Sequence, residues 1–495
     1  MLFNSFEFLI FFPIVSILFF VIPNRYRYIW LLICSYYFYM SWNPKYAVLI
    51  IFSTIITYSS GLLMGYYNES DSISTNKINR YKKRIVTVSI ALNIGILFLF
   101  KYLNFLIQNI NSLFSLVNSS YRVNHFDILL PVGISFYTFQ ALGYTIDVYR
   151  GDVKPERNFL KYALFVSFFP QLVAGPIERT TNLLSQINDE HRLKLRNLQI
   201  GCIWVLWGYF LKLVIADRVA VIVDKVYESP DVYRGLYIVY ATVLFAIQIY
   251  CDFNGYTMIA RGCAKIMDFD LMQNFCSPYL AMSISEFWRR WHISLSSWFR
   301  DYLYIPLGGN RRGNIRKYIN LLIVFLISGL WHGAAWGYVI WGGLNGIYQV
   351  MAELLLPIRK KCLDTFRINV TSILYRSFRI IGTFVLVDIS WIFFRARGIR
   401  ESINVIGNML SAKAGEYSLS ELEFDERELK CLIIALVLLF VVDLLCYIKK
   451  DIVGFIINKG FWFRCIVYVL LFWAVVLTGV YGVDYDASSF IYFQF

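Results

Sequence analysis

The chain is 495 residues long, and its composition excludes an ordinary soluble protein. Hydrophobic residues make up 58% and charged residues 16%, whereas globular proteins average about 45–50% and about 25%. With a mean hydropathy of +0.55, the chain is expected to be an integral membrane protein. In a soluble chain, the net charge of +14 would indicate binding to nucleic acid. Here, however, many of the cations lie in short loops between apolar segments. We therefore expect a lipid bilayer as the partner and no nucleic acid.

The nine cysteines are scattered, and none forms a CxxC pair or stands at a ligand spacing from a histidine. They predict core or lipid-facing thiols and no bound metal. The first 22 residues lack the basic region and the cleavage site of a signal peptide, so we expect a retained first helix.

Apolar segments long enough to cross the hydrocarbon core recur along nearly the whole chain. In chain order they lie near 6–22, 28–42, 45–65, 85–103, 128–147, 199–216, 236–252, 318–350, 372–394, 431–448 and 462–482. The run at 318–350 is long enough for two short helices. A shorter run at 159–175 is interrupted by Pro170 and Gly175 and followed by Pro176, which predicts a re-entrant or half-buried element. The pattern predicts an all-α polytopic protein of roughly 11–12 transmembrane helices plus re-entrant or interfacial helices.

Lysine and arginine clusters predict the orientation of these helices, because short cationic loops stay in the cytoplasm. Five cations at 77–84 place the loop at 66–84 inside. Counting back three crossings predicts an external N-terminus, with Arg25 and Arg27 inside. Cations at 449–459 precede the last helix and acids at 484–486 follow it. The C-terminus is therefore expected outside as well, and so is the acidic loop at 421–428.

Cations flank the 318–350 run on both sides, at 311–317 and at 359–361. The chain must therefore enter the membrane and return, and the natural turn is GLWHG at 329–333, with His332 at the apex. An ionisable side chain inside such an apolar stretch is costly and by default marks a functional pathway. The alternative is a neutral histidine that bonds to a neighbouring helix.

The segment at 283–313 mixes tryptophans and tyrosines with arginines, and it contains His292. Such a mixture predicts an interfacial or partly re-entrant helix. Its arginines, Arg289 and Arg290 among them, are candidates for holding a phosphate-bearing group through charge-assisted hydrogen bonds. A plain positive-inside anchor is the other interpretation.

Two further polar clusters interrupt apolar surroundings, at 252–256 directly after the expected 236–252 helix and at 131–140. They indicate either a polar tunnel or helix contacts. His125 and His191 lie in polar loops and are most simply solvated surface residues. No nucleotide-binding loop, HExxH zinc motif or GxSxG elbow is present in the sequence.

The run FWRRWHISL at 287–295, continued by WFRDYLYIPLGGNR at 298–311, strongly resembles the signature of the membrane-bound O-acyltransferase family, and GLWHG matches its second signature. The two histidines are 332 − 292 = 40 residues apart, a typical spacing. Supporting matches are PVGISFYTFQ at 131–140, FPQLVAGPIER at 169–179, DFNGYT at 252–257, SWIFFRA at 390–396 and FIYFQF at 490–495. The sequence looks most like the bacterial alginate O-acetyltransferase branch and the related D-alanyl transferase of teichoic acids.

The resemblance implies one integral membrane domain over 1–495, with N-terminal helices at 1–150, a core with both histidine motifs at 151–350 and C-terminal helices at 351–495. In it, a cytoplasmic acyl thioester, for example acetyl-CoA, meets an external acceptor inside a central tunnel, and no cofactor is bound. His332 would be the main catalytic residue, whereas His292 is either catalytic, structural or donor-binding. The expected substrate-binding residues are Arg289, Arg290, Trp291, Trp331, Asp252 and Asn254.

The resemblance also implies a cellular location and a partner protein. We expect the bacterial cytoplasmic membrane, a separate extracytoplasmic partner of the SGNH esterase type, and acetyl transfer toward an exopolysaccharide or cell-wall glycan. D-alanyl transfer to teichoic acid is the alternative within the class. A polysaccharide transporter, or a catalytically silent scaffold for the partner, are the alternatives from other classes.

Overall fold

The computed structural model describes residues 1–69, 74–117, 121–127, 130–410, 425–481 and 491. These ranges contain helices and no strand, which confirms the predicted all-α class. The acidic residues at 421–424 and all of FIYFQF except Ile491 lie outside the described residues. The chain separates into two compact units, one of residues 1–202 and 260–272 and the other of residues 203–259 and 273–495.

The first unit contains nine helices among its described residues. They are α1 (Phe6–Val21), α2 (Asn24–Met40), α3 (Ala47–Asn68), α4 (Thr75–Leu97), α5 (Leu103–Leu116), α6 (Ile134–Arg150), α7 (Phe159–Ser167), α8 (Phe169–Leu172) and α9 (Ser185–Asn188). Two more helices, α10 (Leu195–Tyr209) and α12 (Leu236–Ile266), contribute residues to both units.

The second unit holds the remaining helices. They are α11 (Asp217–Glu228), α13 (Ile284–Arg290), α14 (Ile293–Phe299), α15 (Asn314–His332), α16 (Trp336–Leu354), α17 (Leu356–Thr365), α18 (Ile373–Arg395), α19 (Ile399–Leu410), α20 (Glu426–Tyr447), α21 (Ile452–Ile457) and α22 (Phe461–Thr478). Short π-helical or 3₁₀ turns lie at Pro44–Tyr46, Phe98–Tyr102, Thr180–Leu184, Phe210–Ala216, Pro278–Leu280 and Arg300–Tyr304.

Eight helical segments of the described chain are long and apolar enough to cross a membrane, and the pair α16 and α17, bent by 49°, brings the number to nine if it counts as one span. The eight are Pro44–Asn68, Thr75–Leu116, Leu195–Glu228, Leu236–Ile266, Asn314–His332, Ile373–Arg395, Glu426–Tyr447 and Phe461–Thr478. The protein is therefore a multi-pass membrane protein. The number is lower than the 11–12 helices expected from apolarity alone.

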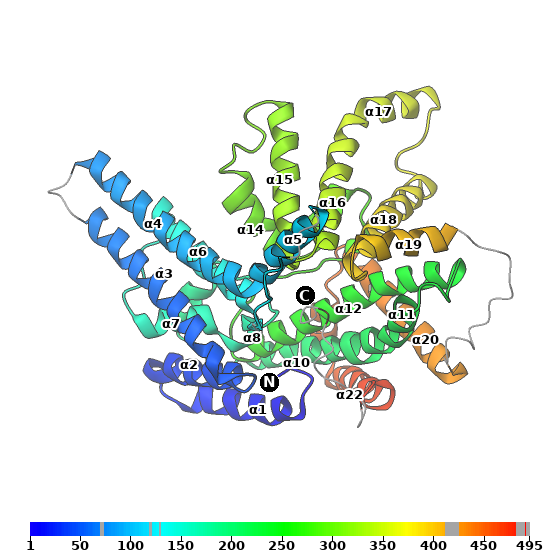
Figure 1. Cartoon of the computed structure of the whole chain (residues 1–495). Helices are drawn as coiled ribbons and strands as arrows, with labels where there is room; N and C mark the ends of the chain where they lie inside the picture. The colour runs from blue at the N-terminus through cyan, green and yellow to red at the C-terminus, as the bar shows by residue number, and fades with distance from the viewer. Residues whose placement is uncertain (70–73, 118–120, 128–129, 411–424, 482–490, 492–495) are drawn as a thin grey trace. The chain divides into compact units, whose positions relative to one another are not determined.

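The difference lies in three apolar segments that form shorter helices. The expected spans at 6–22, 28–42 and 128–147 become α1, α2 and α6, with 16, 17 and 17 residues. Nearly every residue of α6 is buried inside the first unit, where it packs against α3 and α4 (Figure 1). Apolarity in α6 therefore reflects burial in protein. The run at 159–175 forms the short, mostly buried helices α7 and α8, which agrees with the prediction that this run is not a span.

Two other expectations need correction. The DFNGYT cluster lies inside α12, which continues to Ile266, and does not follow a helix that ends at 252. The segment at 283–313 forms two seven-residue helices, α13 and α14, followed by a turn, and not one interfacial helix. Its Trp288, Trp291 and Trp298 are buried.

The expected hairpin is present in the second unit as α15 and α16, which lie side by side (Figure 1). Glycines permit their close approach. A β-carbon at Gly342 would collide with the carbonyl of Phe325, and one at Gly329 would collide with the carbonyl of Tyr338. Small residues at such crossings are typical of membrane helices. The crossing fixes the end of α15, where His332 lies.

Candidate active site in the second unit

His332 is the last residue of α15, directly before the turn that leads into α16. Its side chain is buried, with 4% exposure. Aromatic rings surround it, with ring centroids at 4.9 Å for Trp331, 5.0 Å for Trp341 and 5.5 Å for Phe394. This apolar enclosure keeps bulk water away from the imidazole.

His292 forms the link between α13 and α14 in a left-handed backbone conformation, with φ 43° and ψ 54°. A non-glycine residue rarely adopts this conformation, which costs of order 1–3 kcal/mol and persists where surrounding structure enforces it. Asn274 supplies that enforcement. Its carbonyl accepts the N–H of Ile293 at 2.9 Å, and its Oδ1 accepts the hydroxyl of Ser294 at 2.6 Å.

The two histidines lie close together although 40 residues separate them. Their ring centroids are 6.4 Å apart, and Trp331 lies 6.0 Å from the ring of His292. His292 is fully buried, and this burial lowers its pKa to about 3. Its imidazole is therefore neutral at physiological pH and can accept or donate a hydrogen bond without carrying charge.

A polar network fixes the aromatic wall beside His332. The indole N–H of Trp288 donates to Oδ1 of Asn345 at 3.2 Å, and Nδ2 of Asn345 donates to the hydroxyl of Ser390 at 3.2 Å. Nδ2 of Asn345 also donates to the carbonyl of Trp341 at 2.9 Å. The network ties α13, α16 and α18 together around the histidine.

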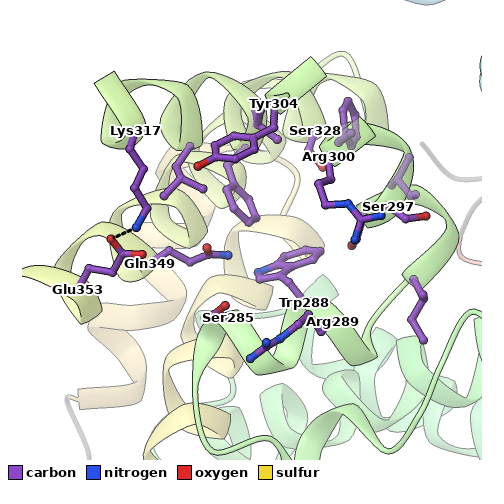
Figure 2. Close-up of a pocket in the computed structure, with 17 residues that line it drawn as sticks. Ser285, Trp288, Arg289, Ser297, Arg300, Tyr304, Lys317, Ser328, Gln349 and Glu353 are labelled. Atoms are coloured by element: carbon purple, nitrogen blue, oxygen red, sulfur yellow. Dashed lines mark hydrogen bonds and ion pairs between the residues drawn. The ribbon is translucent and has the colours of Figure 1, made fainter. Parts of the chain in front are cut away.

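A cavity of about 380 Å³ lies between α13, α14, α15 and α16 (Figure 2). Its volume falls within the about 300–1,000 Å³ typical of small-molecule sites. Aromatic and aliphatic side chains line it together with polar groups, among them Arg289, Arg300, Lys317, Gln349 and Glu353. Lys317 and Glu353 form an ion pair of 2.6 Å across α15 and α16 (Figure 2).

The cavity extends toward the histidine pair. Ser328, one helical turn before His332 on α15, lines it, as does Ile293, the neighbour of His292. Trp288 also lines it, and its ring lies 5.6 Å from Trp341, which contacts His332. The cavity wall and the aromatic enclosure of His332 are therefore in contact, through Trp288 and Trp341.

The other predicted site residues lie in different surroundings. Arg289 is exposed and lines the cavity. Arg290 points elsewhere, because it pairs with Glu286 at 2.9 Å and donates to the carbonyl of Cys276 at 3.1 Å. Trp291 is buried, with its ring 5.1 Å from that of Trp391. Their roles toward a substrate stay predictions.

Asp252 and Asn254 lie on α12, and the carboxylate of Asp252 is already engaged. It forms an ion pair of 2.7 Å with Lys212 and accepts the backbone N–H of Ile491 at 2.8 Å. Lys212 also pairs with Asp217 at 2.8 Å, and all three side chains are buried. Asn254 is half-buried. The next residue after Asp252, Phe253, packs against His292 with ring centroids 4.7 Å apart.

The prediction for His191 is wrong, whereas His125 is exposed as expected. His191 is buried, and its ring lies 4.0 Å from that of Phe269. Its nitrogens lie 3.2 Å from the carbonyl of Asp268 and 2.8 Å from that of Gln186. Tertiary packing within the first unit, which the polar local sequence does not reveal, encloses it.

Sequence reasoning missed Asn274, Asn345 and Ser390, which support the histidine pair, and Lys212, which pairs with Asp252. Lys212 could have been found, because a lysine within the apolar run at 199–216 requires a partner. An isolated amide or hydroxyl gives no comparable signal.

Buried histidines beside a cavity in a multi-pass membrane protein are an arrangement suited to acyl transfer away from water, and the sequence comparisons agree. The family model described as MBOAT, the membrane-bound O-acyltransferase family, matches residues 156–385, which include both histidines. The chain belongs to this family and is a membrane-bound O-acyltransferase.

Among the relatives is the "Probable alginate O-acetylase AlgI" of Pseudomonas putida, 37% identical over 85% of this chain and 82% of the relative. The "Peptidoglycan O-acetyltransferase" of Helicobacter pylori is 34% identical over 77% of this chain and 73% of its own length. The "Teichoic acid D-alanyltransferase" of Streptococcus thermophilus is 28% identical over 46% of this chain and 58% of its own length.

Proposed function

We propose that this protein transfers an acetyl group from a cytoplasmic thioester, acetyl-CoA, toward hydroxyl groups of an extracytoplasmic polysaccharide or cell-wall glycan. His332 acts as the general base. The observation that carries the proposal is the pair of buried histidines, 6.4 Å apart, next to a cavity that is lined by Ile293, which follows His292, and by Ser328, one helical turn before His332. The names of the relatives that match most of the chain support the acetyl group and the glycan.

The chemical step needs one base and a site without bulk water. The imidazole of His332 takes the proton of an acceptor hydroxyl while the oxygen attacks the thioester carbonyl carbon. The tetrahedral intermediate then collapses, the C–S bond breaks, and the thiolate recovers the proton from His332. An ester and free thiol result. Burial of His332 protects the thioester from hydrolysis during the step.

The donor enters, in this proposal, from the side of Lys317. This residue belongs to the cationic stretch at 311–317 that the positive-inside rule places in the cytoplasm. Arg289, Arg300 and Lys317 line the cavity, and cations of this kind suit the phosphates of coenzyme A. The acceptor arrives from the opposite face, where an SGNH-type partner passes the acetyl group to the polymer. The termini are extracytoplasmic, and the membrane is the bacterial cytoplasmic membrane.

D-alanyl transfer has weaker support. The teichoic acid relatives share 28% identity over only 46% of this chain, whereas the acetyl transferases match 77% or more. The same histidine chemistry serves both acyl groups, so the choice depends on the donor.

The test uses the full chain in lipid nanodiscs with acetyl-labelled coenzyme A, with and without a uronate oligosaccharide as hydroxyl acceptor. His332→Ala is expected to lower transfer at least about 10²-fold, the lower range for loss of a general base. His125→Ala, an exposed histidine, is the matched control and is expected to keep full activity. A D-alanyl pantetheine thioester replaces acetyl-CoA in a parallel reaction.

The outcomes separate the parts of the proposal. Acetyl transfer that His332→Ala abolishes supports both donor and base. Equal activity of the two histidine variants removes His332 from the mechanism. If the protein uses the D-alanyl thioester faster than acetyl-CoA, the transferred group in the proposal is D-alanine and not acetyl. If the protein transfers neither group, even after the SGNH-type partner is added, the proposal that it is the enzyme is contradicted.

A further inference from the structure

A second cavity, of about 530 Å³, lies within the first unit. Its lining comes from the first turns of α2, from α7 and its preceding residue, and from the end of α9 with the residues that follow it, at 187–191. Three cations contribute to the walls, namely Arg25, Arg27 and Lys161, together with the amides of Asn24, Asn158 and Asn188. The cavity is separate from the histidine site, which belongs to the other unit.

The cations of this cavity are held in place by neutral groups. Arg27 donates to three carbonyls, those of Ile22 at 2.9 Å, Phe20 at 3.1 Å and His191 at 2.5 Å. Lys161 donates to Oδ1 of Asn188 at 2.6 Å. The charges of Arg27 and Lys161 are therefore oriented by contacts that do not neutralise them.

Carboxylates of the lining compensate this charge only in part, because three cations face two carboxylates, of which Glu190 interacts electrostatically with Arg27. Asp189 and Glu190 also line the cavity, and Glu190 pairs with Arg192 at 3.6 Å. Within the part of the chain that the structure describes, Arg25, Arg27 and Lys161 form no ion pair. The backbone N–H groups at the start of α2, a 17-residue helix whose first turn has no side-chain cap, add further positive potential. The cavity therefore favours an anion.

The adjoining helix places this cavity at the membrane surface. Side chains of α1 from Phe6 to Val21 present an exposed apolar face, with Phe6, Leu9, Ile10, Ile14, Ile17 and Val21 between 51% and 73% exposed. Such a face belongs in lipid. It ends at Val21, and the polar lining begins at Asn24. The cavity thus lies where acyl chains give way to headgroups.

We propose that this cavity binds a phosphate group at the membrane surface, the phosphodiester of an anionic phospholipid headgroup whose acyl chains lie along α1. Arg25 and Lys161 contact the phosphate, and Arg27 supplies fixed charge beside it. Free inorganic phosphate has the same chemistry, and the experiment separates the two sources. Bound lipid would join α1, α2 and α7 and stabilise the first unit.

The experiment measures binding of dioctanoyl phosphatidylglycerol to the purified full chain in detergent, by native mass spectrometry and by the shift in Tm. Dioctanoyl phosphatidylcholine and inorganic phosphate are the comparison ligands. Arg25→Gln with Lys161→Gln is expected to weaken phosphatidylglycerol binding about 30-fold, on the basis of about 1 kcal/mol for each cation near a membrane surface. Lys77→Gln with Arg80→Gln is the matched control, because it removes two exposed cations from α4 of the same unit.

Tight binding of phosphatidylglycerol that only the Arg25 and Lys161 variant loses supports the lipid site. If inorganic phosphate raises the Tm of the wild type as much as the lipid does, and the same variant abolishes this effect, the phosphate site stands and its source is free phosphate. Equal binding of phosphatidylcholine and phosphatidylglycerol, or equal binding by the two variants, overturns the proposal. None of these outcomes depends on acyl transfer.

Discussion

His292 combines two unfavourable features, a left-handed backbone and full burial of an ionisable ring. Asn274 offsets the cost of the left-handed backbone, since it accepts hydrogen bonds from the two residues that follow the histidine, Ile293 and Ser294. Sequence inspection singles out His292 within a conspicuous aromatic motif. It passes over Asn274, an amide in an unremarkable stretch whose importance comes only from the fold.

Burial of His292 predicts how stability depends on pH. Its pKa is lowered from 6.5 to about 3 in the folded protein, so between these values the unfolded chain binds the additional proton. The folded state therefore loses stability as pH falls through this window. We expect the Tm in detergent to decrease from about pH 7 to about pH 4.5, with a smaller decrease in His292→Asn. Asparagine does not titrate and tolerates the left-handed conformation.

His125→Asn is the control for this measurement, because His125 is exposed and its removal leaves the buried imidazole in place. The slope of Tm against pH should match that of the wild type in this control. If His292→Asn keeps the full wild-type slope, the acid sensitivity arises elsewhere.

At the scale of elements, the α15 and α16 crossing determines where His332 lies. Gly342 and Gly343 are neighbours on α16 but differ in surroundings. A β-carbon at Gly342 would collide with the carbonyl of Phe325, whereas one at Gly343 would meet only Leu326 Cδ2 at 3.5 Å. The two positions thus provide a matched pair.

We expect Gly342→Ala to destabilise the protein by about 1–3 kcal/mol, the usual cost of overpacking. It should also lower acyl transfer more than tenfold, because a shifted crossing moves the end of α15. Gly343→Ala should keep activity and raise stability by up to about 1 kcal/mol through helix propensity. Thermal unfolding and transfer assays on both variants check this pair of outcomes. Equal effects of the two changes would show that the crossing does not control His332.

The hairpin itself was predictable, since cations at both ends of the apolar run require the chain to return. The short lengths of helices α2 and α6 could not be predicted. Apolar side chains buried in protein and those facing lipid look alike in sequence, so α6 was expected to be a span. The proximity of His292 and His332 in the structure was not predicted, because a separation of 40 residues specifies no geometry by itself.

At the scale of the whole molecule, charge predicts the orientation of the chain in the membrane. Cys362 is exposed on α17, beside the cations at 359–361 that the positive-inside rule places in the cytoplasm. We expect a membrane-impermeant maleimide to label Cys362 in inside-out vesicles and not in intact cells. In the Cys362→Ser variant this labelling should disappear, which identifies Cys362 as the labelled residue.

His125→Cys in the Cys362→Ser chain is the opposite marker, because residue 125 is exposed in a loop expected outside. It should react in intact cells. Labelling of Cys362 from outside would reverse the orientation and, with it, the side from which the proposed donor enters.

The aromatic enclosure of His332 has an optical consequence. Of the 13 tryptophans in the chain, five gather around the histidine pair, and each is at most 8% exposed. They are Trp288, Trp291, Trp331, Trp341 and Trp391. Indoles in such surroundings emit at shorter wavelength than indoles in water, and their emission responds to a neighbouring thioester or charged imidazole. The ultraviolet fluorescence of the unlabelled protein should therefore report when a ligand occupies the cavity beside His332.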